Sequence, residues 1–343
     1  MRNIETMRLM VTAVLAAGML IGRSAAAQPD ARPIPLKVAV SSYLSYAPFF
    51  IAEEEGFFVE QGLAVELLRV SSEAALIPAL VQGQVDALAA AIMPAYVNVI
   101  ARGGEMKIVA GRGHYATEGC TYSGIMARRD LVESGALETA ADLAGLRVST
   151  ERTTTSYYRF DKLLSTGGLT LEDVRIVDLP VAAELDAFAT DALDIATVSE
   201  PWLTRLRRGG HAVLFARASD YLPDFQFGYL LYGPSLLTDN PEAGERFLTA
   251  YLKATRQLNR DGKSPRHLAI LMKHTSLDEA TLEEACWPHL DDDGRVRVQS
   301  LEQYQEWALE RGLIDRIVST EEMHDPRFLE AANRSLAESG GGP

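Results

Sequence analysis

Cysteine is nearly absent from this sequence, and histidine is sparse. The 343 residues include two cysteines, Cys120 and Cys286, and six histidines. Two cysteines at this spacing form neither a disulfide framework nor a zinc-binding pattern, and the histidines include no HExxH or HxH sequence. The sequence therefore predicts no metal site. It leaves open whether the two thiols stay free or form one disulfide bond in an oxidising compartment.

An excess of basic charge is also absent. The chain has 33 Lys and Arg residues against 47 Asp and Glu residues, which gives a formal net charge of −14 at pH 7. So acidic a surface repels phosphate groups and anionic lipid, which argues against binding to nucleic acid or to a membrane surface. The acidic run 291–294 lacks the remaining ligand positions of a calcium loop, so we expect a solvated turn there.

Motifs for catalysis and nucleotide binding are missing as well. The sequence has no GxxxxGK[ST] or GxGxxG loop, no GxSxG or SxxK nucleophile, and no cysteine placed near a histidine. Such motifs supply phosphate-binding amides or an activated nucleophile. We therefore expect a protein that is not an enzyme and that needs no cofactor.

Long apolar runs are absent except near the start of the chain. Residues 9–22 are mostly apolar, follow a start that contains Arg2 and Arg8, and precede three alanines that end at Ala27. This is the pattern of a secretory signal peptide, and its run of about 14 residues is shorter than the ~20 that span a bilayer. The sequence predicts a signal peptide over residues 1–27, cleaved after Ala27, and therefore an exported protein.

The remaining chain alternates between short apolar runs and helical patterns. Strands are predicted at 36–40, 63–70, 85–92, 106–110, 123–127, 146–150, 174–179, 193–198, 213–216 and 227–232. Helices are predicted at 48–61, 72–82, from 94, at 140–144, 155–165, 182–190, 202–208, 241–258, 265–272, 277–286, 301–311 and 326–337. Strands joined by crossover helices form parallel sheets covered on both faces. This order therefore predicts an α/β fold with two lobes, a ligand cleft between them and a helical C-terminal extension.

Four loops that follow predicted strands are candidates for a binding site, because ligands of open α/β sheets lie beyond the carboxyl ends of the strands. The first loop contains Ser42, Tyr43 and Tyr46. Their hydroxyls and rings suit a planar ligand, although an ordinary turn with the tyrosines in the core fits as well. In the second loop, Met93 precedes Pro94 at a helix start, and it either lines a pocket or packs in the core.

The third loop carries a run of hydroxyl side chains at the start of a predicted helix. The candidate residues are Thr153, Thr154, Thr155 and Tyr157. Free N–H groups at a helix start bind polar or anionic groups, and a single threonine can also cap the helix. We expect capping together with ligand contact.

The fourth loop contains Glu200 and Trp202. Glu200 either accepts a hydrogen bond from a ligand or stabilises the start of the following helix through its dipole. Trp202 is either a stacking surface or part of the core, and we expect one of the two residues to face the ligand. Tyr122 and Gln226 complete the set of predicted ligand-binding residues.

A series of short sequences in a fixed order runs through most of the mature chain. They are Ala47-Pro48-Phe49-Phe50-Ile51-Ala52, Glu55-Gly56-Phe57-Phe58, Gly62-Leu63, Leu80-Val81-Gln82-Gly83-Gln84-Val85-Asp86-Ala87, Ala141-Asp142-Leu143-Ala144-Gly145-Leu146-Arg147-Val148, the stretch 153–157, Leu193-Asp194-Ile195-Ala196, Glu200-Pro201 and Asn240-Pro241-Glu242. Over residues 36–313 this series resembles the solute-binding proteins of ABC importers in the NMT1/THI5-like, nitrate–sulfonate–taurine group.

The resemblance implies a two-lobed type II periplasmic-binding fold. Lobe I would comprise residues 35–120 and 226–337, lobe II residues 121–225, and residues 338–343 a disordered tail. Segments 113–121 and 221–227 would be the hinge that lets the lobes close on a ligand. The implied partners are a small-molecule ligand and the transmembrane permease of an ABC importer, and we expect a monomer.

The resemblance leaves the ligand open, since family members bind nitrate, taurine, sulfonates, phthalates, riboflavin or thiamine-pyrimidine precursors. The aromatic residues of the candidate loops favour a planar ligand, pyrimidine-like first and an aromatic carboxylate or sulfonate second. Arg112, His114 and Arg152 either balance an acid group of the ligand or form surface ion pairs. The alternatives are a sulfonate, taurine or nitrate anion and, from another class, a pyrimidine-synthase-like enzyme.

Overall fold

The computed structural model describes residues 32–70, 72–152 and 154–339. The predicted signal peptide lies outside these residues, as do Thr153 and residues 340–343 of the predicted tail. Within the described part of the chain, every helix is too short or too polar to cross a membrane.

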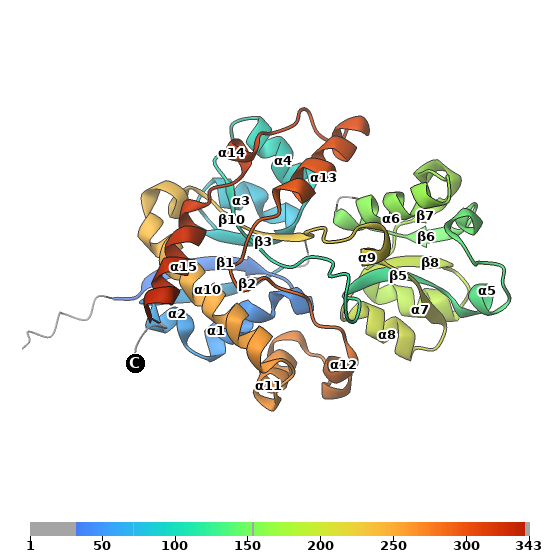
Figure 1. Cartoon of the computed structure of the whole chain (residues 1–343), viewed down its shortest axis with the longest axis horizontal. Coiled ribbons are helices and arrows are strands. Elements are labelled where there is room, and N and C mark those ends of the chain that lie inside the picture. Colours follow the sequence, from blue (N-terminus) through green and yellow to red (C-terminus); the bar gives the residue numbers. More distant parts are fainter. Residues whose placement is uncertain (1–31, 71, 153, 340–343) are drawn as a thin grey trace, which may run out of the picture. The chain divides into compact units, whose positions relative to one another are not determined.

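Five strands form the first sheet, in the order β2-β1-β3-β10-β4 (Figure 1). Their bounds are β1 Ile34–Val40, β2 Leu63–Arg69, β3 Ala87–Ala91, β4 Lys107–Gly111 and β10 Gly228–Tyr232. β1 pairs in parallel with β2 and β3, while β10 is antiparallel to β3 and β4. The chain therefore returns to this sheet through β10 after it has built the second one.

The second sheet also has five strands, in the order β7-β6-β8-β5-β9. Their bounds are β5 Ser123–Arg128, β6 Arg147–Ser149, β7 Arg175–Val177, β8 Ile195–Ser199 and β9 Ala212–Arg217. β6 is parallel to β7 and β8, but β5 is antiparallel to β8 and β9. The predicted α/β fold is confirmed. The strand pairs β1/β2, β1/β3, β6/β7 and β6/β8 are parallel as predicted, but neither sheet is parallel throughout. Each sheet is mixed because β5 and β10 follow segments that pass between the sheets and not crossover helices.

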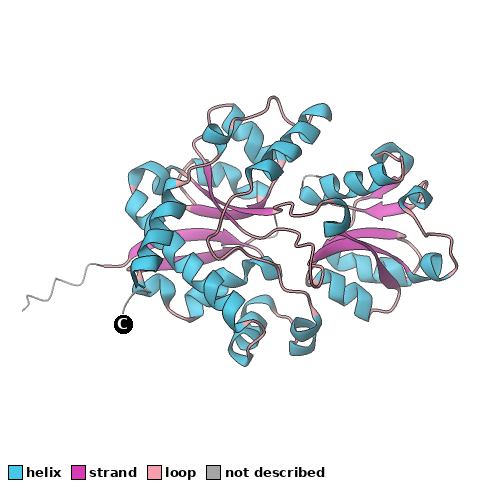
Figure 2. Cartoon of the chain, in the orientation of Figure 1, coloured by secondary structure: helices cyan, strands magenta, loops and turns pink. Residues whose placement is uncertain are grey.

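Both faces of the first sheet are covered by helices, as Figure 2 shows. Consecutive residues of β1, Val38, Ala39 and Val40, are all fully buried although they point to alternate faces. β3 has the sequence ALAAA, and its small side chains let helices pack closely on the sheet. This pattern explains why these strands read as continuous apolar runs in the sequence.

The helices between the strands of the first sheet are α1 Ala47–Glu54, α2 Phe57–Glu60, α3 Ile77–Val81 and α4 Pro94–Ala101. The single helix predicted over 48–61 is divided into α1 and α2. Gly56 lies between them with a φ of 74°, a left-handed conformation that interrupts the helix and that glycine adopts without strain. α4 begins at Pro94, as predicted.

The helices of the second sheet are α5 Arg129–Glu133, α6 Thr155–Thr166, α7 Glu184–Ala189, α8 Trp202–Arg208 and α9 Ala218–Tyr221. We did not predict α5 and α9, because helices of five and four residues show no apolar period in the sequence. The helix predicted over 140–144 is a short 3₁₀ helix, Ala140–Leu143.

The C-terminal region is helical, as predicted. It contains α10 Pro241–Asp261, α11 Pro265–Thr275, α12 Glu279–Glu284, α13 Val298–Glu310, α14 Thr320–Met323 and α15 Arg327–Ser339. The buried face of α10, which includes Phe247 and Tyr251, packs against the aromatic side chains of α1 and α2. α15 continues to Ser339, so it extends into the predicted tail.

Two segments connect the sheets: the first crossing segment, residues 113–121, and the second crossing segment, residues 221–227. They lie side by side, because Tyr115 N–H donates to Phe225 O at 3.0 Å and Asp224 N–H donates to Tyr115 O at 3.0 Å. Gly113 has a φ of 100°, and a Cβ there would lie 2.7 Å from the Phe227 ring. Only glycine therefore allows this close approach.

The helices of the second sheet contact the C-terminal helices at two places. Asp161 of α6 accepts hydrogen bonds from Trp307 Nε1 at 2.9 Å and from Arg311 Nη2 at 2.6 Å. Arg208 of α8 forms an ion pair with Asp278, which precedes α12, at 3.2 Å. The C-terminal region therefore contacts helices of the second sheet as well as those of the first.

A disulfide bond joins Cys120 and Cys286, which are 166 residues apart in sequence. Cys120 belongs to the first crossing segment, and Cys286 follows α12. This answers the question that the sequence left open. The bond fixes the C-terminal region to the connection between the two sheets.

Removing the disulfide should destabilise the folded protein. A Cys120→Ser/Cys286→Ser double variant should lose about 3 kcal/mol of unfolding free energy, because a crosslink that closes so long a loop restricts the unfolded chain. Urea unfolding without reductant measures the loss. Reductant should lower the stability of the wild type to the same value and leave the double variant unchanged. Equal stability of variant and wild type would contradict the prediction.

Candidate ligand-binding site

A cavity of about 670 Å³ lies where strands of both sheets end. We call it the ligand cavity, because its size suits a small organic molecule and its position is the usual binding position in α/β proteins. It is lined at the ends of β3, β6 and β8 by Ala91, Ser149 and Ser199. Other side chains that line the cavity are those of Tyr43, Ser45, Tyr46, Glu73, Arg112, Tyr115, Tyr122, Glu151, Thr154, Thr155, Arg159, Asp178, Glu184 and Phe227.

Arg112 directly follows β4 and enters the ligand cavity from the first sheet. It is only 2% exposed. Its guanidinium group donates to Ser45 Oγ and lies 3.9 Å from the centre of the Tyr46 ring, a cation–π contact. Its Nε has no hydrogen-bond partner within the described residues.

Arg159 enters the ligand cavity from α6 and is 1% exposed. It donates to Tyr115 Oη at 3.1 Å and to the carbonyl oxygen of Val198 at 3.3 Å. All of its partners are neutral groups, and its Nε has no partner among the residues that the structure describes.

The positive charges of Arg112 and Arg159 are not neutralised by the protein. Within the described ranges, no carboxylate oxygen lies within 4.0 Å of either guanidinium group. Four carboxyl groups do line the ligand cavity, but Glu151 and Asp178 are exposed, Glu73 is half-buried and Glu184 is hydrogen-bonded to Ser149. Because a buried charge without a partner is unfavourable, the two arginines could hold an anionic group in this cavity.

Aromatic rings form one wall of the ligand cavity. The Phe227 ring is stacked between those of Tyr115 and Tyr122, with 5.1 Å between ring centres in each pair. Tyr43 and Tyr46 add two further rings from the loop after β1. Such a wall offers flat apolar surface to a planar ligand.

Glu184, the first residue of α7, places a buried carboxyl group in the ligand cavity. Ser149 Oγ donates to its Oε1 at 2.6 Å, and its Oε2 has no partner within the described residues. Burial raises the pKa of Glu184 to about 8. The group is therefore mostly protonated at pH 7 and can donate a hydrogen bond to a ligand.

The hydroxyl side chains at the start of α6 line the ligand cavity as well. Thr154 caps the helix by accepting a hydrogen bond from Ser156 N–H at 3.2 Å, so the predicted capping is confirmed. Thr154 and Thr155 are both buried in the cavity wall. Thr153 lies outside the described residues, and ligand contact by this loop stays a prediction.

Of the other predicted site residues, the structure brings Tyr43, Tyr46 and Tyr122 together in the ligand cavity. Ser42 is exposed and does not line it, and Met93 is 1% exposed in the core. Of the two alternatives given for Met93, packing in the core therefore describes the structure.

Glu200 and Trp202 lie outside the ligand cavity. Glu200 accepts hydrogen bonds from Thr204 N–H at 3.1 Å and from Cys286 N–H at 3.0 Å, so it stabilises the start of α8, the alternative that the sequence left open. Trp202 packs on the apolar cluster beneath α8, with the guanidinium carbon of Arg205 4.8 Å from its ring centre.

Gln226 and Tyr157 also have structural contacts and do not line the ligand cavity. Gln226 accepts from Arg297 N–H at 2.7 Å and donates to Arg295 O at 3.0 Å, which ties the second crossing segment to the chain before α13. The Tyr157 ring makes an edge contact with Trp307, with 6.2 Å between ring centres.

Sequence reasoning missed Arg159 and Glu184. A local signal existed for Arg159, because it lies four residues after Thr155 and four before Leu163, on the buried face of α6. No local signal marked Glu184, whose surroundings are built by Ser149 and other residues distant in sequence.

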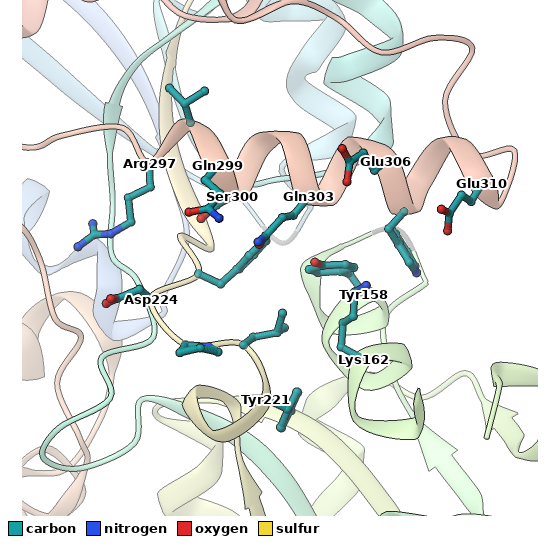
Figure 3. Close-up of a pocket in the computed structure, with 15 residues that line it drawn as sticks. Tyr158, Lys162, Tyr221, Asp224, Arg297, Gln299, Ser300, Gln303, Glu306 and Glu310 are labelled. Atoms are coloured by element: carbon teal, nitrogen blue, oxygen red, sulfur yellow. The ribbon is translucent and has the colours of Figure 1, made fainter. Parts of the chain in front are cut away.

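A second cavity, of about 730 Å³, lies between α6 and α13 (Figure 3). Glu306 and Glu310 of α13 and Lys162 of α6 line it, and its remaining lining residues come from helices and the second crossing segment. The two glutamates are exposed. No strand end contributes to this lining, so the ligand cavity is the better candidate for a binding site.

The fold is similar to that of periplasmic binding proteins of known structure. The nitrate-binding protein NrtA of Synechocystis PCC 6803 superposes with a TM-score of 0.72 at 16% identity, covering 88% of this chain and 89% of that one. The aliphatic sulphonate-binding protein SsuA of Escherichia coli superposes with a TM-score of 0.70 at 15% identity, covering 86% of this chain and 93% of that one. At such identities the likeness shows the fold alone.

An enzyme shares the fold as well. The desulfurization enzyme DSZB has a TM-score of 0.65 at 16% identity, covering 88% of this chain and 99% of that one. A variant of DSZB in complex with biphenyl-2-sulfinic acid has a TM-score of 0.61 at the same identity and the same coverage.

The family follows from the sequence. Residues 44–261 match the family model described as NMT1/THI5 like, so the chain belongs to the NMT1/THI5-like family. A protein of Brucella abortus (strain 2308) that carries the name of a binding protein is 24% identical over 253 residues, which cover 73% of this chain and 74% of that protein. The family expected from the ordered motifs is thereby confirmed.

The buried carboxyl group of Glu184 should make stability depend on pH. Its folded-state pKa of about 8 is above its ordinary value of 4.5, so between these values only the folded state holds the proton. Stability should therefore fall as pH rises from 5 to 8, by at most about 1.4 kcal/mol per pH unit. Urea unfolding at pH 5, 6.5 and 8 should show a flatter profile for Glu184→Gln. The exposed Glu172→Gln should keep the wild-type profile, and identical profiles for all three proteins would refute the prediction.

Proposed function

We propose that this protein is the periplasmic substrate-binding component of an ABC importer, and that it carries a small planar molecule with an acid group. One observation carries this proposal: Arg112 and Arg159 are buried in the ligand cavity without a carboxylate partner, beside a wall of aromatic rings. An aromatic carboxylate or sulfonate supplies both the missing negative charge and a flat ring. The two arginines favour this class over the pyrimidine-like ligand that the sequence ranked first.

Glu184 adds a requirement on the ligand. As a neutral carboxyl group it donates a hydrogen bond, and its Oε2 lacks a partner within the described chain. A ligand carbonyl, ring nitrogen or second acid oxygen would accept that bond. Glu184 therefore supports a ligand with a polar group besides the one that faces the arginines.

The positions of these three side chains in the fold support capture of the ligand by closure of two lobes. Arg112 follows β4 of the first sheet, whereas Arg159 and Glu184 belong to α6 and α7 beside the second sheet. A ligand that binds both sets favours the arrangement in which they are close together. We propose the two crossing segments as the hinge, with lobes of residues 35–120 plus 226–337 and of residues 121–225.

Export and delivery complete the proposal. The signal-peptide pattern of residues 1–27 supports release into the periplasm. NrtA and SsuA are named as periplasmic binding proteins, which supports the same compartment here. The closed, loaded monomer would be recognised by the transmembrane permease of the importer.

The fold of DSZB raises the alternative of an enzyme. Nucleophilic catalysis needs a nucleophile next to a base. Both cysteines of this chain form the disulfide, and the described residues that line the ligand cavity include no histidine, cysteine or lysine. This composition favours binding without turnover.

A thermal-shift screen tests the ligand class on the mature protein. The panel contains benzoate and benzenesulfonate as acid-bearing rings, benzamide and aminopyrimidine as neutral rings, and taurine and nitrate as anions without a ring. We expect the acid-bearing rings to raise the unfolding temperature most, because only they use the arginines and the rings together. Stabilisation by taurine or nitrate alone, or by neutral rings alone, would overturn the proposed class.

Exchanging Arg159 for glutamine should weaken ligand binding without unfolding the protein. Loss of a charged hydrogen bond corresponds to about 1.5–3 kcal/mol, or roughly a 10- to 100-fold weaker affinity for the best acid-bearing ring. Isothermal titration calorimetry measures the affinity. The ligand-free unfolding temperature should stay equal or rise, because a buried charge is removed.

Arg175→Gln is the matched control, since Arg175 is an exposed arginine of the same sheet region and lies outside the ligand cavity. It should bind as the wild type does. Unchanged affinity in Arg159→Gln would exclude Arg159 as a ligand contact.

A further inference from the structure

His114 occupies a position at which three separate parts of the chain meet. It belongs to the first crossing segment and forms β-bridges with Gln226 of the second crossing segment and with His289. His289 lies between α12 and α13, in residues 285–297, which we call the C-terminal segment. His114 is 4% exposed, and neither ring nitrogen has a hydrogen-bond partner within the described residues. A buried polar group without a partner is uncommon and calls for an explanation.

The groups that face His114 are metal ligands by chemical type. Its Nε2 lies 3.9 Å from Asp291 Oδ1, and the ring of His289 stands edge-on to its own, with 4.7 Å between ring centres. One ligand atom from each of His114, His289 and Asp291 lies within 4.8 Å of the other two. Two imidazoles and one carboxylate form a usual ligand set for zinc.

The distance between His114 and Asp291 is close to what an ion requires. Zinc binds nitrogen and oxygen ligands at ~2.1 Å in a tetrahedron, which places the ligand atoms about 3.4 Å apart. The 3.9 Å between His114 Nε2 and Asp291 Oδ1 needs only a small side-chain movement to match. A water molecule would complete the tetrahedron.

The surroundings supply outer contacts of the kind that orient metal ligands. Asp224 Oδ1 lies 3.3 Å from His114 Nδ1, on the ring nitrogen that faces away from Asp291. A carboxylate behind a ligating histidine fixes the tautomer that leaves Nε2 free to bind. Arg297 donates to both oxygens of Asp291, to Oδ2 through Nη1 and to Oδ1 through Nη2 at 3.2 Å. Figure 3 shows Asp224 and Arg297 at the same end of the second cavity.

A further feature makes binding feasible. His114 and His289 both line a separate cavity of about 220 Å³, so there is space for an ion beside the two rings. Two groups compete with the ion for Asp291 Oδ1: Arg295 Nη2 lies 3.1 Å and Arg297 Nη2 lies 3.2 Å from this oxygen. The Arg295 side chain is 62% exposed and can move into solvent when the ion binds, whereas Arg297 can keep its hydrogen bond to Oδ2.

We propose that His114, His289 and Asp291 bind a divalent transition-metal ion, for which Zn²⁺ is the best match, and that the ion links the first crossing segment to the C-terminal segment. None of the three residues lines the ligand cavity. The metal site is thus separate from the site of the proposed function and does not depend on it.

A second group of potential ligands, Glu53, Glu54 and His274, does not support the same inference. Lys273 Nζ lies 2.6 Å from Glu54 Oε1, and Arg69 Nη2 lies 2.8 Å from His274 Nδ1. His274 Nε2 also lies 2.7 Å from Glu54 Oε1, so both ring nitrogens of His274 have partners, whereas those of His114 have none within the described residues.

Metal binding is tested on the mature protein without a histidine tag, after removal of metal by EDTA and dialysis. Calorimetric titration with Zn²⁺ should show one equivalent bound per chain. His289→Gln, at an exposed position that the fold tolerates, should weaken Zn²⁺ binding at least tenfold, and Asp224→Asn should weaken it by about tenfold as well. Co²⁺ should give the visible absorption of a tetrahedral site in the wild type and lose it in His289→Gln.

Two further variants serve as controls. His211→Gln removes an exposed histidine outside the cluster and should bind Zn²⁺ as the wild type does. Arg295→Gln should bind Zn²⁺ several-fold more tightly, because a charge that competes for Asp291 Oδ1 is removed. Circular dichroism confirms that each variant is folded. Absence of Zn²⁺ binding in the wild type, wild-type binding by His289→Gln, or weaker binding by Arg295→Gln would overturn the proposal.

Discussion

The pairing of the two crossing segments is the constraint on which the rest of the structure depends. The chain leaves the first sheet after β4 and returns to it through β10, so both crossings are adjacent and share backbone hydrogen bonds. Their pairing places Tyr115 next to Phe227 in the wall of the ligand cavity. It also places His114 next to Gln226 and the C-terminal segment. The ligand cavity and the proposed metal site thus lie on the same connection.

The ligand cavity combines charge and ring surface in a way that neither sheet provides alone. Arg112 comes from the first sheet, Arg159 from a helix of the second, and the ring column from the crossing segments. Burial makes each charge effective, since the low polarity around it leaves an anion as its best partner. The same burial keeps the carboxyl group of Glu184 protonated. One cavity therefore offers two positive groups and one neutral acid to its ligand.

The elements of the fold were predictable where a local pattern encodes them. The buried strand β1, the helix start at Pro94 and the long helix α10 each carry their own apolar period or terminal residue. Of the predicted site residues, Tyr43, Tyr46, Tyr122, Thr154 and Thr155 line the ligand cavity, because strand-end position is itself a local property. The direction of β5 and β10 was not predictable in this way, since it depends on the partner strand.

What the sequence by itself determined is the α/β class, the family and the strand-end loops, because these depend on residues that are neighbours along the chain. Only the tertiary structure decided which distant residues meet. Cys120 is 166 residues from Cys286, and His114 meets His289 across a similar separation. The contacts of Glu200 and Gln226 were not predictable for the same reason, because their hydrogen-bond partners are distant in sequence and lie in the C-terminal segment. Such contacts cannot be predicted from composition and residue spacing, because the contacts form only when the chain packs.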